Sequence, residues 1–396
     1  MSTPGRIGFI PARFGPGIIG GAEIVLARLA NGFAERGWSA EVLTTCAVDH
    51  YSFANELPAG VSEQGGLTVR RFAAVQDTAG HEHGAVEAAA LAGSRVPLAA
   101  QERWMNDGVR VPDLFHYLLD HGRDYTALVF GPYMFWPAFA CSQVVPERSV
   151  LWACLHDEPY ARFELFRPML TGVAGLLLQT EPEHELAHRL VPGLAQHAVT
   201  GCGVEVPVEY QPERFRQRYG IDRPFLFYAG RREGAKGWED LLRAFAAAVS
   251  GRDLPFALVS AGSGPVNAPT EIANRVIDVG FLPEQDRDDA FSAAAAYLQP
   301  SRYEAFSRTI MEAWLAGTPV IANGASDVVR WHCERSGAGL FYDDDIEFEE
   351  ILTFLATQPG DAHVMAAGGR DYVLDNYQWP GVLERVEKAV TGWVAP

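Results

Sequence analysis

The sequence predicts a protein of two α/β domains, each a parallel sheet with helices on both faces. Short apolar runs alternate with amphipathic segments along most of the 396 residues, as they do in doubly wound folds. The runs are hydrophobic on both sides, as the strands of a covered parallel sheet must be. They also form two series, which are separated by the Pro-rich, charged segment 205–224.

The first series gives an N-terminal domain over residues 1–204. Helical segments lie between its expected strands, and the first of these segments is 22–36. Residues 76–112 are rich in alanine and less regular, so we interpret them as an insertion in this domain. The expected strands are 6–10, 40–45, 127–131, 150–155 and 175–180.

The second series gives a C-terminal domain over residues 225–375, with 205–224 as the linker. In the helical segment 238–250, the apolar residues repeat at the spacing of one helical face. Two such domains facing each other would leave a central cleft at the carboxyl ends of their strands, where doubly wound folds bind ligands. The expected strands are 225–229, 256–261, 276–279, 296–299, 319–322 and 338–342.

The composition excludes several classes of partner. A formal net charge of −18 argues against binding to nucleic acid, which needs a basic surface, and against attachment to an anionic membrane. No apolar run reaches the ~18 residues of a membrane-spanning helix, and the N-terminus lacks the apolar region of a secretory signal. The five cysteines are scattered without a CxxC pair, which favours buried thiols in a reducing compartment. We therefore expect a cytoplasmic protein without membrane insertion.

A glycine-rich segment, GPGIIGGAE at 15–23, follows the first expected strand. It contains GxGxxG, but four residues separate Gly15 from the strand and the second strand ends without an acid for a ribose, which argues against a dinucleotide site. A purely structural turn is an alternative. We favour a third interpretation, in which Gly20 and Gly21 let backbone N–H groups at the next helix start approach an anion or a sugar.

A cationic loop, AGRREGAKGWEDLL at 229–242, joins the first strand of the second domain to a helix. It is not a Walker A loop, because Ala235 and Gly237 replace residues that this motif requires. It nevertheless places Arg231 and Lys236 at the carboxyl end of a strand. In a chain of charge −18, two such cations suit a diphosphate, although two solvated loop cations remain the alternative.

Three further motifs have both a functional and a structural interpretation. His156 in LHDEPYA follows a strand of the first domain, so it is either a ligand contact in the cleft or a structural histidine. HEH at 81–83 lacks accompanying metal ligands, which favours ordinary loop residues. DDD at 343–345 precedes a helical pattern, which favours acids stabilised by the helix dipole. We therefore expect no metal site.

The segment SRYEAFSRTIMEAWLAGTPVIAN, 301–323, contains two glutamates eight positions apart. Ser307 is a candidate N-cap for a helix that continues through four apolar positions, and Gly317 ends it. The unpaired N–H groups at the helix start suit a phosphate. Glu304 lies before the helix and Glu312 about one turn inside it, so each can accept hydrogen bonds from hydroxyls on either side of that phosphate. A phosphate between two polyols is a nucleotide sugar.

Together these motifs resemble those of the retaining glycosyltransferases of family four, which have the GT-B fold of two Rossmann-like domains. The similar segments span most of the chain in matching order, and one of them carries the E-x7-E pattern of the family. The last segment, 376–396, resembles the C-terminal helix that crosses back onto the first domain. The other segments are 20–38, 230–245, 304–323 and 337–344.

The resemblance implies a role for each matching residue. Glu304 matches the acid that contacts the hydroxyls of the donor sugar, and Glu312 matches the acid that holds the ribose. Arg231 and Lys236 match the pair that binds the diphosphate. Many family members have glycine where this chain has Ser307, so the resemblance is weaker at the local donor-sugar pocket, though not at the phosphate site. The remaining matches are Phe306, Ser307 and Arg308 with the backbone at the phosphate or sugar, Gly20 and Gly21 with the glycine loop, and His156 with the histidine near the transferred sugar.

The resemblance also implies an activity. The enzyme would move a sugar from a nucleoside diphosphate sugar to a hydroxyl of a soluble acceptor, either a small molecule, a natural product or a saccharide, with retention at the anomeric carbon. Because cations and a helix start would stabilise the leaving diphosphate, we expect no metal and no other cofactor. Two alternatives stay open: a GT-B sugar-nucleotide epimerase or phosphorylase, and a catalytically silent partner that binds nucleotide sugar for another transferase.

Overall fold

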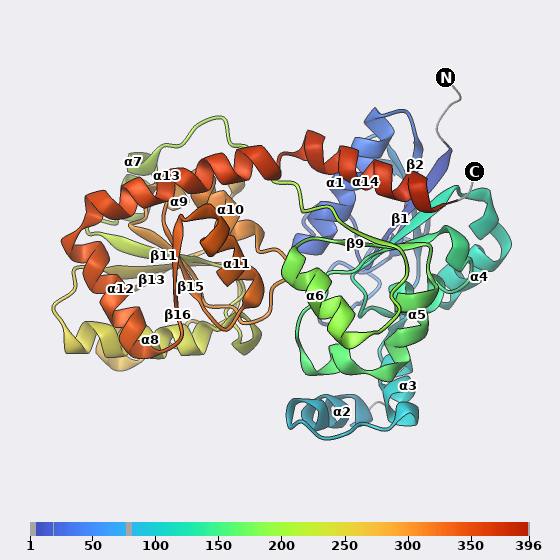
Figure 1. Cartoon of the computed structure of the whole chain (residues 1–396), viewed down its shortest axis with the longest axis horizontal. Coiled ribbons are helices and arrows are strands. Elements are labelled where there is room, and N and C mark those ends of the chain that lie inside the picture. The colour runs from blue at the N-terminus through green and yellow to red at the C-terminus, as the bar shows by residue number, and fades with distance from the viewer. Residues whose placement is uncertain (1–4, 19, 77–80, 395–396) are drawn as a thin grey trace. The chain divides into compact units, whose positions relative to one another are not determined.

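The chain folds into two compact units, each an α/β structure with its own sheet (Figure 1). A computed structural model describes residues 5–18, 20–76 and 81–394. Within these ranges, no helix has both the length and the apolar composition needed to cross a bilayer. Unit 1 contains residues 1–202 and 380–396, and unit 2 contains residues 203–379.

Unit 1 is built on an eight-stranded sheet with the order β10-β9-β8-β7-β1-β2-β4-β3. Neighbouring strands pair in parallel, except for the antiparallel hairpin of β3 and β4 at one edge. The five strands predicted for this domain are confirmed. They are β1 (Arg6–Pro11), β2 (Ser39–Thr45), β7 (Ala127–Gly131), β8 (Ser149–Trp152) and β9 (Gly175–Leu178).

Some details of this sheet differ from the sequence prediction. Strand β8 ends three residues early, because Cys154 has a φ of 55°, a left-handed conformation that cannot continue a strand. Strand β3 is exposed along most of its length and therefore lacks a two-sided apolar pattern. The strands that were not predicted are β3 (Gly60–Gln64), β4 (Leu67–Phe72) and β10 (His197–Val199).

The segment 76–112 is more regular than its composition suggested. It holds two helices, and a short antiparallel pair of strands, β5 and β6, encloses them. Residues 77–80 lie outside the described residues. The helices of unit 1 are α1 (Gly21–Glu35), α2 (His81–Leu91), α3 (Leu98–Asn106), α4 (Pro112–His121), α5 (Arg167–Gly172), α6 (Glu181–Leu190) and α14 (Trp379–Trp393), and the short strands are β5 (Val75–Gln76) and β6 (Val109–Arg110).

Unit 2 is built on a six-stranded parallel sheet with the order β13-β12-β11-β14-β15-β16. All six strands that the sequence predicted are confirmed to within one residue at either end. They are β11 (Phe225–Ala229), β12 (Ala257–Ala261), β13 (Val276–Gly280), β14 (Ala296–Gln299), β15 (Val320–Asn323) and β16 (Gly339–Tyr342).

Helices cover both faces of the sheet in unit 2 (Figure 1). The segment 205–224, which we expected to be a linker, lies in unit 2 and contains a helix, α7. Arg214 of this helix donates to the buried carboxylate of Asp289 at 2.5 Å, so the segment is fixed to α9. The helices are α7 (Pro212–Tyr219), α8 (Trp238–Gly251), α9 (Glu284–Ala293), α10 (Arg308–Leu315), α11 (Asp327–Ser336), α12 (Asp345–Thr357) and α13 (Pro359–Asn376).

The C-terminal segment consists of α13 in unit 2 and α14, of which residues 380–393 belong to unit 1. Helix α14 packs against α1 and its following turn. The carboxylate of Glu387 accepts hydrogen bonds from the guanidinium of Arg36 and from the indole N–H of Trp38, both at 2.7 Å.

Trp314 of α10 is fully buried in unit 2. Its indole N–H donates to the carbonyl of Ala338 at 2.9 Å, which fixes the ring. Helix α13 crosses this ring at Gly369, where an added Cβ would lie 2.4 Å from Cγ of Trp314. The position of α10 therefore depends on close packing against α13.

We expect Gly369→Ala to destabilise the protein by about 1–3 kcal/mol, because the extra methyl group overpacks a fixed core. The matched control is Gly360→Ala in the same helix, where an added Cβ meets no atom within 4 Å. Urea unfolding of both variants measures the effect. Equal stability of the two variants would contradict this account of the packing.

Candidate functional site

The candidate site in unit 2 lies where two neighbouring strands end. Strands β11 and β14 pair in parallel, so their carboxyl ends meet at one edge of the sheet. The loop after β11 carries Arg231 and Lys236, and the loop after β14 carries Glu304. The topology thus brings together the cationic loop and the first glutamate of the motif.

A glycine brings these two loops into contact. Gly237 has a φ of 70°, and a Cβ at this position would lie only 2.4 Å from the carbonyl oxygen of Pro300. A residue with a side chain would therefore be both strained and obstructed. The amide of Asn323, at the end of β15, donates to the same carbonyl at 3.1 Å. The loop after β11 and the end of β15 thus both meet the chain at Pro300, just after β14.

Lys236 and Glu304 form a direct ion pair. The ammonium Nζ donates to Oε1 of Glu304 at 2.8 Å, and the glutamate side chain is only 12% exposed. Gln299 also donates to this oxygen at 3.0 Å, and its own carbonyl accepts the hydroxyl hydrogen of buried Tyr297 at 2.9 Å. This chain of hydrogen bonds fixes the carboxylate with little freedom.

Sequence analysis did not identify Gln299. It is the last residue of a buried strand, at the edge where doubly wound sheets bind ligands. That position was the available signal, but an isolated glutamine at a strand end has no distinctive spacing to other residues.

Arg231 lies in the same loop but turns to a different partner. Its guanidinium pairs with the carboxylate of Glu233 at 3.0 Å and is 41% exposed. Its carbonyl accepts the hydroxyl hydrogen of Tyr228 at 2.6 Å, which fixes the backbone of the loop. The side chain is therefore anchored at its base and accessible at its charged end.

Helix α10 begins immediately after Ser307, as expected, but this serine does not cap the helix with its side chain. It has φ 65° and ψ 78°, and its hydroxyl makes no capping hydrogen bond. The buried hydroxyl oxygen has no hydrogen-bond partner within the described part of the chain. A left-handed conformation favours glycine and strains other residues by about 1–3 kcal/mol, so the chain here adopts a conformation that suits a glycine.

Arginines flank the second glutamate of the motif. Glu312 lies on α10 with its carboxylate 3.5 Å from Nε of Arg287 and 3.7 Å from Arg308. Burial raises the pKa of the neighbouring Asp288 to about 7, so its carboxyl group adds little negative charge at lower pH. Arg287 comes from α9, and no sequence motif predicted its contribution.

Phe306 belongs to the core rather than to an open surface. Its ring lies edge-on to His332 and Tyr377, with centroid distances of 5.2 and 4.9 Å. The ring therefore anchors the loop before α10, and only the backbone of this residue is in a position to act as the resemblance implies.

In unit 1, His156 follows β8 in a partly buried loop. The ring is 25% exposed, with Nδ1 3.5 Å from a carboxylate oxygen of Glu158 and Nε2 3.9 Å from Sγ of Cys154. Glu158 is buried and also accepts the hydroxyl hydrogen of Tyr133 at 2.8 Å. Burial alone lowers the pKa of His156, but the contacts with Cys154 and Glu158 outweigh it, and the pKa lies well above its ordinary value.

A buried glutamate of α6 fixes the backbone of this loop. One carboxylate oxygen of Glu183 accepts the N–H of Leu155 at 2.6 Å, and the other accepts that of Gln179 at 2.5 Å. Burial raises the pKa of Glu183 to about 7. Sequence analysis did not identify Glu158 or Glu183, because their role depends on contacts that only the fold creates.

Gly20 and Gly21 stand at the start of α1, as the sequence suggested. A Cβ on Gly20 would lie 2.1 Å from a carboxylate oxygen of Glu23, whereas one on Gly21 would meet nothing within 4 Å. Glu23 is held by the buried guanidinium of Arg13 at 2.6 Å. The helix start therefore lies beside a fixed ion pair.

The two weak motifs have structural roles where they are described. The carboxylate of Asp344 accepts the N–H groups of Ile346 and Glu347 at 2.9 Å, which confirms DDD as helix N-terminal acids. The ring of His83 stacks on Trp104, with centroids 5.3 Å apart. The side chains of the other two HEH residues lie outside the described residues.

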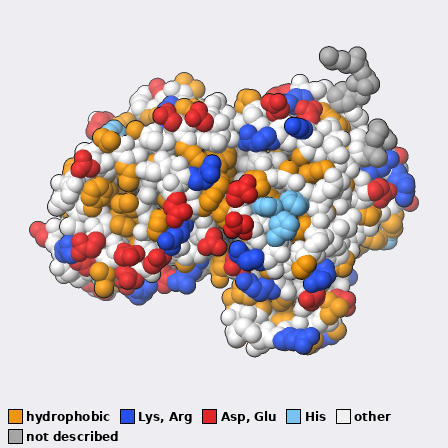
Figure 2. All heavy atoms as spheres, viewed as in Figure 1, with side chains coloured by type: hydrophobic (Ala, Val, Ile, Leu, Met, Phe, Trp, Pro, Cys, Tyr) orange, Lys and Arg blue, Asp and Glu red, His pale blue; other side chains and the backbone are white. Residues whose placement is uncertain are grey.

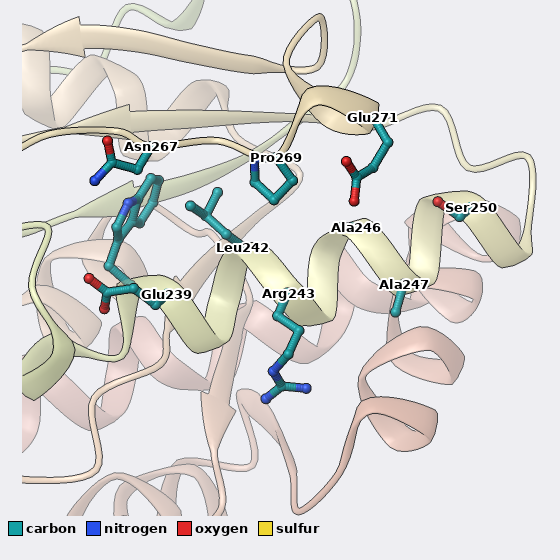
Figure 3. Close-up of a pocket in the computed structure, with 10 residues that line it drawn as sticks. Glu239, Leu242, Arg243, Ala246, Ala247, Ser250, Asn267, Pro269 and Glu271 are labelled. Atoms are coloured by element: carbon teal, nitrogen blue, oxygen red, sulfur yellow. The ribbon is translucent and has the colours of Figure 1, made fainter.

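A pocket of about 470 Å³ in unit 2 lies apart from these residues (Figure 3). One wall is α8, with Leu242 and Ala246 facing the pocket, and Asn267 and Pro269 lie opposite. None of the predicted site residues lines it, and it is mostly apolar along the helix. We therefore do not assign it to the site.

We expect the pKa of His156 to exceed its ordinary value of about 6.5, and Glu158→Gln to lower it, because the substitution removes the neighbouring negative charge. NMR titration of the histidine Cε1–H signals, assigned with a His156→Gln variant, measures this. The matched control is Glu164→Gln, an exposed carboxylate farther along the same loop. A midpoint at or below the ordinary value in the parent protein would contradict the role given to Glu158.

The raised pKa of His156 also makes the stability of the folded protein depend on pH. Because the folded-state pKa of His156 lies above the unfolded one, protonation stabilises the folded state fully below about pH 6.5. This contribution is lost as the pH rises through the folded-state pKa. The loss should be smaller in Glu158→Gln.

Comparisons with known proteins agree with this architecture. Residues 223–358 match the family of glycosyl transferases group 1. Over 123 residues, the chain is 36% identical to a 2-deoxystreptamine glucosyltransferase of Streptomyces kanamyceticus, which covers 28% of this chain and 31% of that protein. The chain thus matches about a third of the length of this curated relative.

Similar solved structures cover nearly the whole chain. A sucrose-phosphate synthase from Thermosynechococcus elongatus has a TM-score of 0.72 at 16% identity and covers 98% of both chains. HepE from Anabaena in complex with UDP-glucose has a TM-score of 0.71 at 16% identity, covering 98% of this chain and 99% of that one. The chain therefore has the GT-B fold, and the part of unit 2 that carries the candidate site matches the group 1 glycosyltransferases.

Proposed function

We propose that this protein is a retaining glycosyltransferase of family four, which moves a sugar from a nucleoside diphosphate sugar to a hydroxyl of an acceptor. The observation that carries the proposal is the contact of Lys236 with Glu304 at 2.8 Å, at adjoining strand ends beside the start of α10. Such a pair offers a cation for a phosphate and a carboxylate for sugar hydroxyls within one site. The family match over 223–358 and the UDP-glucose complex of the similar HepE support it.

The diphosphate of the donor is assigned to Arg231, Lys236 and the start of α10. Arg231 keeps its charged end accessible, and Lys236 is held by a contact that a phosphate oxygen can replace. The N-terminus of α10 adds the positive end of its dipole, and Arg308 is its first residue. These groups stabilise the negative charge that develops on the departing diphosphate.

The two glutamates take the hydroxyls on either side of that diphosphate. Glu304, fixed by Lys236 and Gln299, accepts hydrogen bonds from the transferred sugar. Glu312, placed inside α10 between two arginines, accepts them from the ribose. This assignment gives the E-x7-E spacing its physical meaning, since one helix start separates the two carboxylates.

The proposed reaction breaks the bond between the anomeric carbon and the diphosphate oxygen. The acceptor oxygen forms its bond to the same face of the sugar, and its proton passes to an oxygen of the departing phosphate. In this front-face mechanism the protein supplies positioning and positive charge, and no carboxylate nucleophile is assigned. His156, Gly20 and Gly21 keep the roles that the family resemblance implies.

A pocket of about 770 Å³ in unit 1 is our candidate for the acceptor site. It lies between the α2–α3 connection and the loop that begins at His156, and Arg95, Gln101 and Arg162 line it with apolar residues. The aromatic run at 131–139 contributes to the core, where Tyr133 is fully buried, so we do not assign it to the acceptor. A pocket of this size that combines charged and polar side chains with apolar ones suits a soluble acceptor that bears hydroxyl groups.

We expect substitution of the two glutamates to affect different kinetic constants. Glu304→Gln should lower kcat by about 10²-fold, roughly 3 kcal/mol, because its contacts tighten as positive charge develops on the sugar. Glu312→Gln should mainly raise KM, because its bonds to the ribose are similar in ground and transition states. Steady-state kinetics with the donor identified by thermal-shift screening of common nucleotide sugars gives both values.

Calorimetry with UDP or GDP, lacking the sugar, provides the binding test for this division. Glu304→Gln should bind the diphosphate nearly as well as the parent, and Glu312→Gln more weakly. The matched control is Glu213→Gln, an exposed carboxylate on α7 of the same unit. Equal losses of affinity in both site variants would overturn the division of roles. A protein that binds the donor but releases no sugar would instead be the silent partner.

We also expect transfer without a divalent metal, because the cationic side chains and the start of α10 occupy the place of a cation at the diphosphate. Turnover should be unchanged after EDTA treatment and should not increase with Mg²⁺ or Mn²⁺. Loss of turnover in EDTA with recovery on addition of Mg²⁺ would refute this.

A further inference from the structure

Three histidines form a cluster on unit 1 that has no place in the proposed reaction. His184 and His188 lie one turn apart on α6, and His197 is the first residue of β10. One nitrogen from each ring lies within 4.8 Å of the others, and the Nε2 atoms of His184 and His188 are 3.0 Å apart. Figure 2 shows histidine side chains gathered on this surface of unit 1.

A hydrogen bond orients the ring of His197, and a contact with a carboxylate orients that of His184. Nδ1 of His197 lies 3.0 Å from the carbonyl oxygen of Ala195, which can only accept, so this nitrogen carries the proton and Nε2 carries the lone pair. Nδ1 of His184 lies 3.4 Å from a carboxylate oxygen of Glu181, which favours the same tautomer. A carboxylate or carbonyl behind the ring is the usual arrangement of histidines that bind metals through their other nitrogen.

The spacing and ligand type fit one class of ion. Two histidine nitrogens on a tetrahedral Zn²⁺ lie roughly 3.3 Å apart, given Zn–N bonds of about 2.0–2.1 Å. Imidazole nitrogens prefer Zn²⁺ and its first-row neighbours, whereas Mg²⁺ and Ca²⁺ prefer oxygen ligands.

We propose that His184, His188 and His197 form a binding site for one Zn²⁺-like transition-metal ion, with water completing its coordination. The ion would join α6 to β10, the edge strand of the sheet in unit 1. Helix α6 also carries Glu183, which holds the loop of His156 through the N–H of Leu155. Occupancy therefore stabilises the part of unit 1 that supports this loop, without the metal taking part in sugar transfer.

The test uses the full-length, untagged protein after chelation and desalting. Co²⁺ absorption and calorimetry with Zn²⁺ should show one ion per chain, and Zn²⁺ should raise the melting temperature, whereas Mg²⁺ should not. His188→Ala should weaken Zn²⁺ binding at least 100-fold, because it removes a ligand. Glu181→Gln should weaken it about tenfold, because it removes only the partner behind His184.

The matched control is His363→Ala, an exposed histidine on α13 of unit 2, which should bind Zn²⁺ like the parent. Melting without metal checks that each variant is folded, and His197→Gln replaces His188→Ala if that variant is not. Equal Zn²⁺ affinity in the ligand variants and in the control, or no bound ion in the parent, would overturn the site. Since none of the three histidines is assigned to the donor, metal binding is measured independently of transfer activity.

Discussion

The candidate site of unit 2 depends on the close approach of Gly237 to the carbonyl of Pro300. A Cβ at position 237 would lie 2.4 Å from the carbonyl oxygen of Pro300, so only glycine fits there. Glycine also adopts the observed φ of 70° without strain. The contact brings the loop after β11 against the exit of β14, and Asn323 holds the same oxygen from β15. Lys236, the residue before this glycine, thereby reaches Glu304. The ion pair is thus a consequence of backbone packing as much as of charge.

Helix α10 is fixed from the opposite side. Its apolar face is buried, and Trp314 is fixed both by a hydrogen bond and by the surface of α13 at Gly369. A helix start that must meet a phosphate has to be rigid, because electrostatic stabilisation depends on groups that are already in place. Ser307 holds a left-handed conformation at this start, with its hydroxyl buried and unpaired within the described chain. Strain at such a position is typical of functional sites.

The sequence was sufficient where hydrophobic pattern and strand order determine the structure. All six strands of unit 2 and five strands of unit 1 follow from two-sided apolar runs, and the loops after β11 and β14 follow from them. Strand β3 is exposed, and β10 has three partly buried residues, so neither has such a pattern. Contacts between segments far apart in the chain could not be predicted from the sequence either. Gln299 and Arg287 contact glutamates that only the fold brings near them. The three histidines become a cluster only when the fold places β10 next to α6.

An acidic chain can bind a nucleotide sugar if the donor's phosphates can replace the carboxylates that pair with its cations. In the ligand-free site, Lys236 is paired with Glu304, Arg231 with Glu233, and the arginines near α10 with Glu312. Under the proposed function, a diphosphate that takes Lys236 would leave Glu304 in need of new hydrogen-bond donors, which the sugar hydroxyls would provide. Phosphate and sugar binding would therefore be coupled through one carboxylate, which Gln299 holds in place. Such exchange would let the sugar add to the binding of the phosphate, which would favour the complete donor over the many other phosphates of a cell.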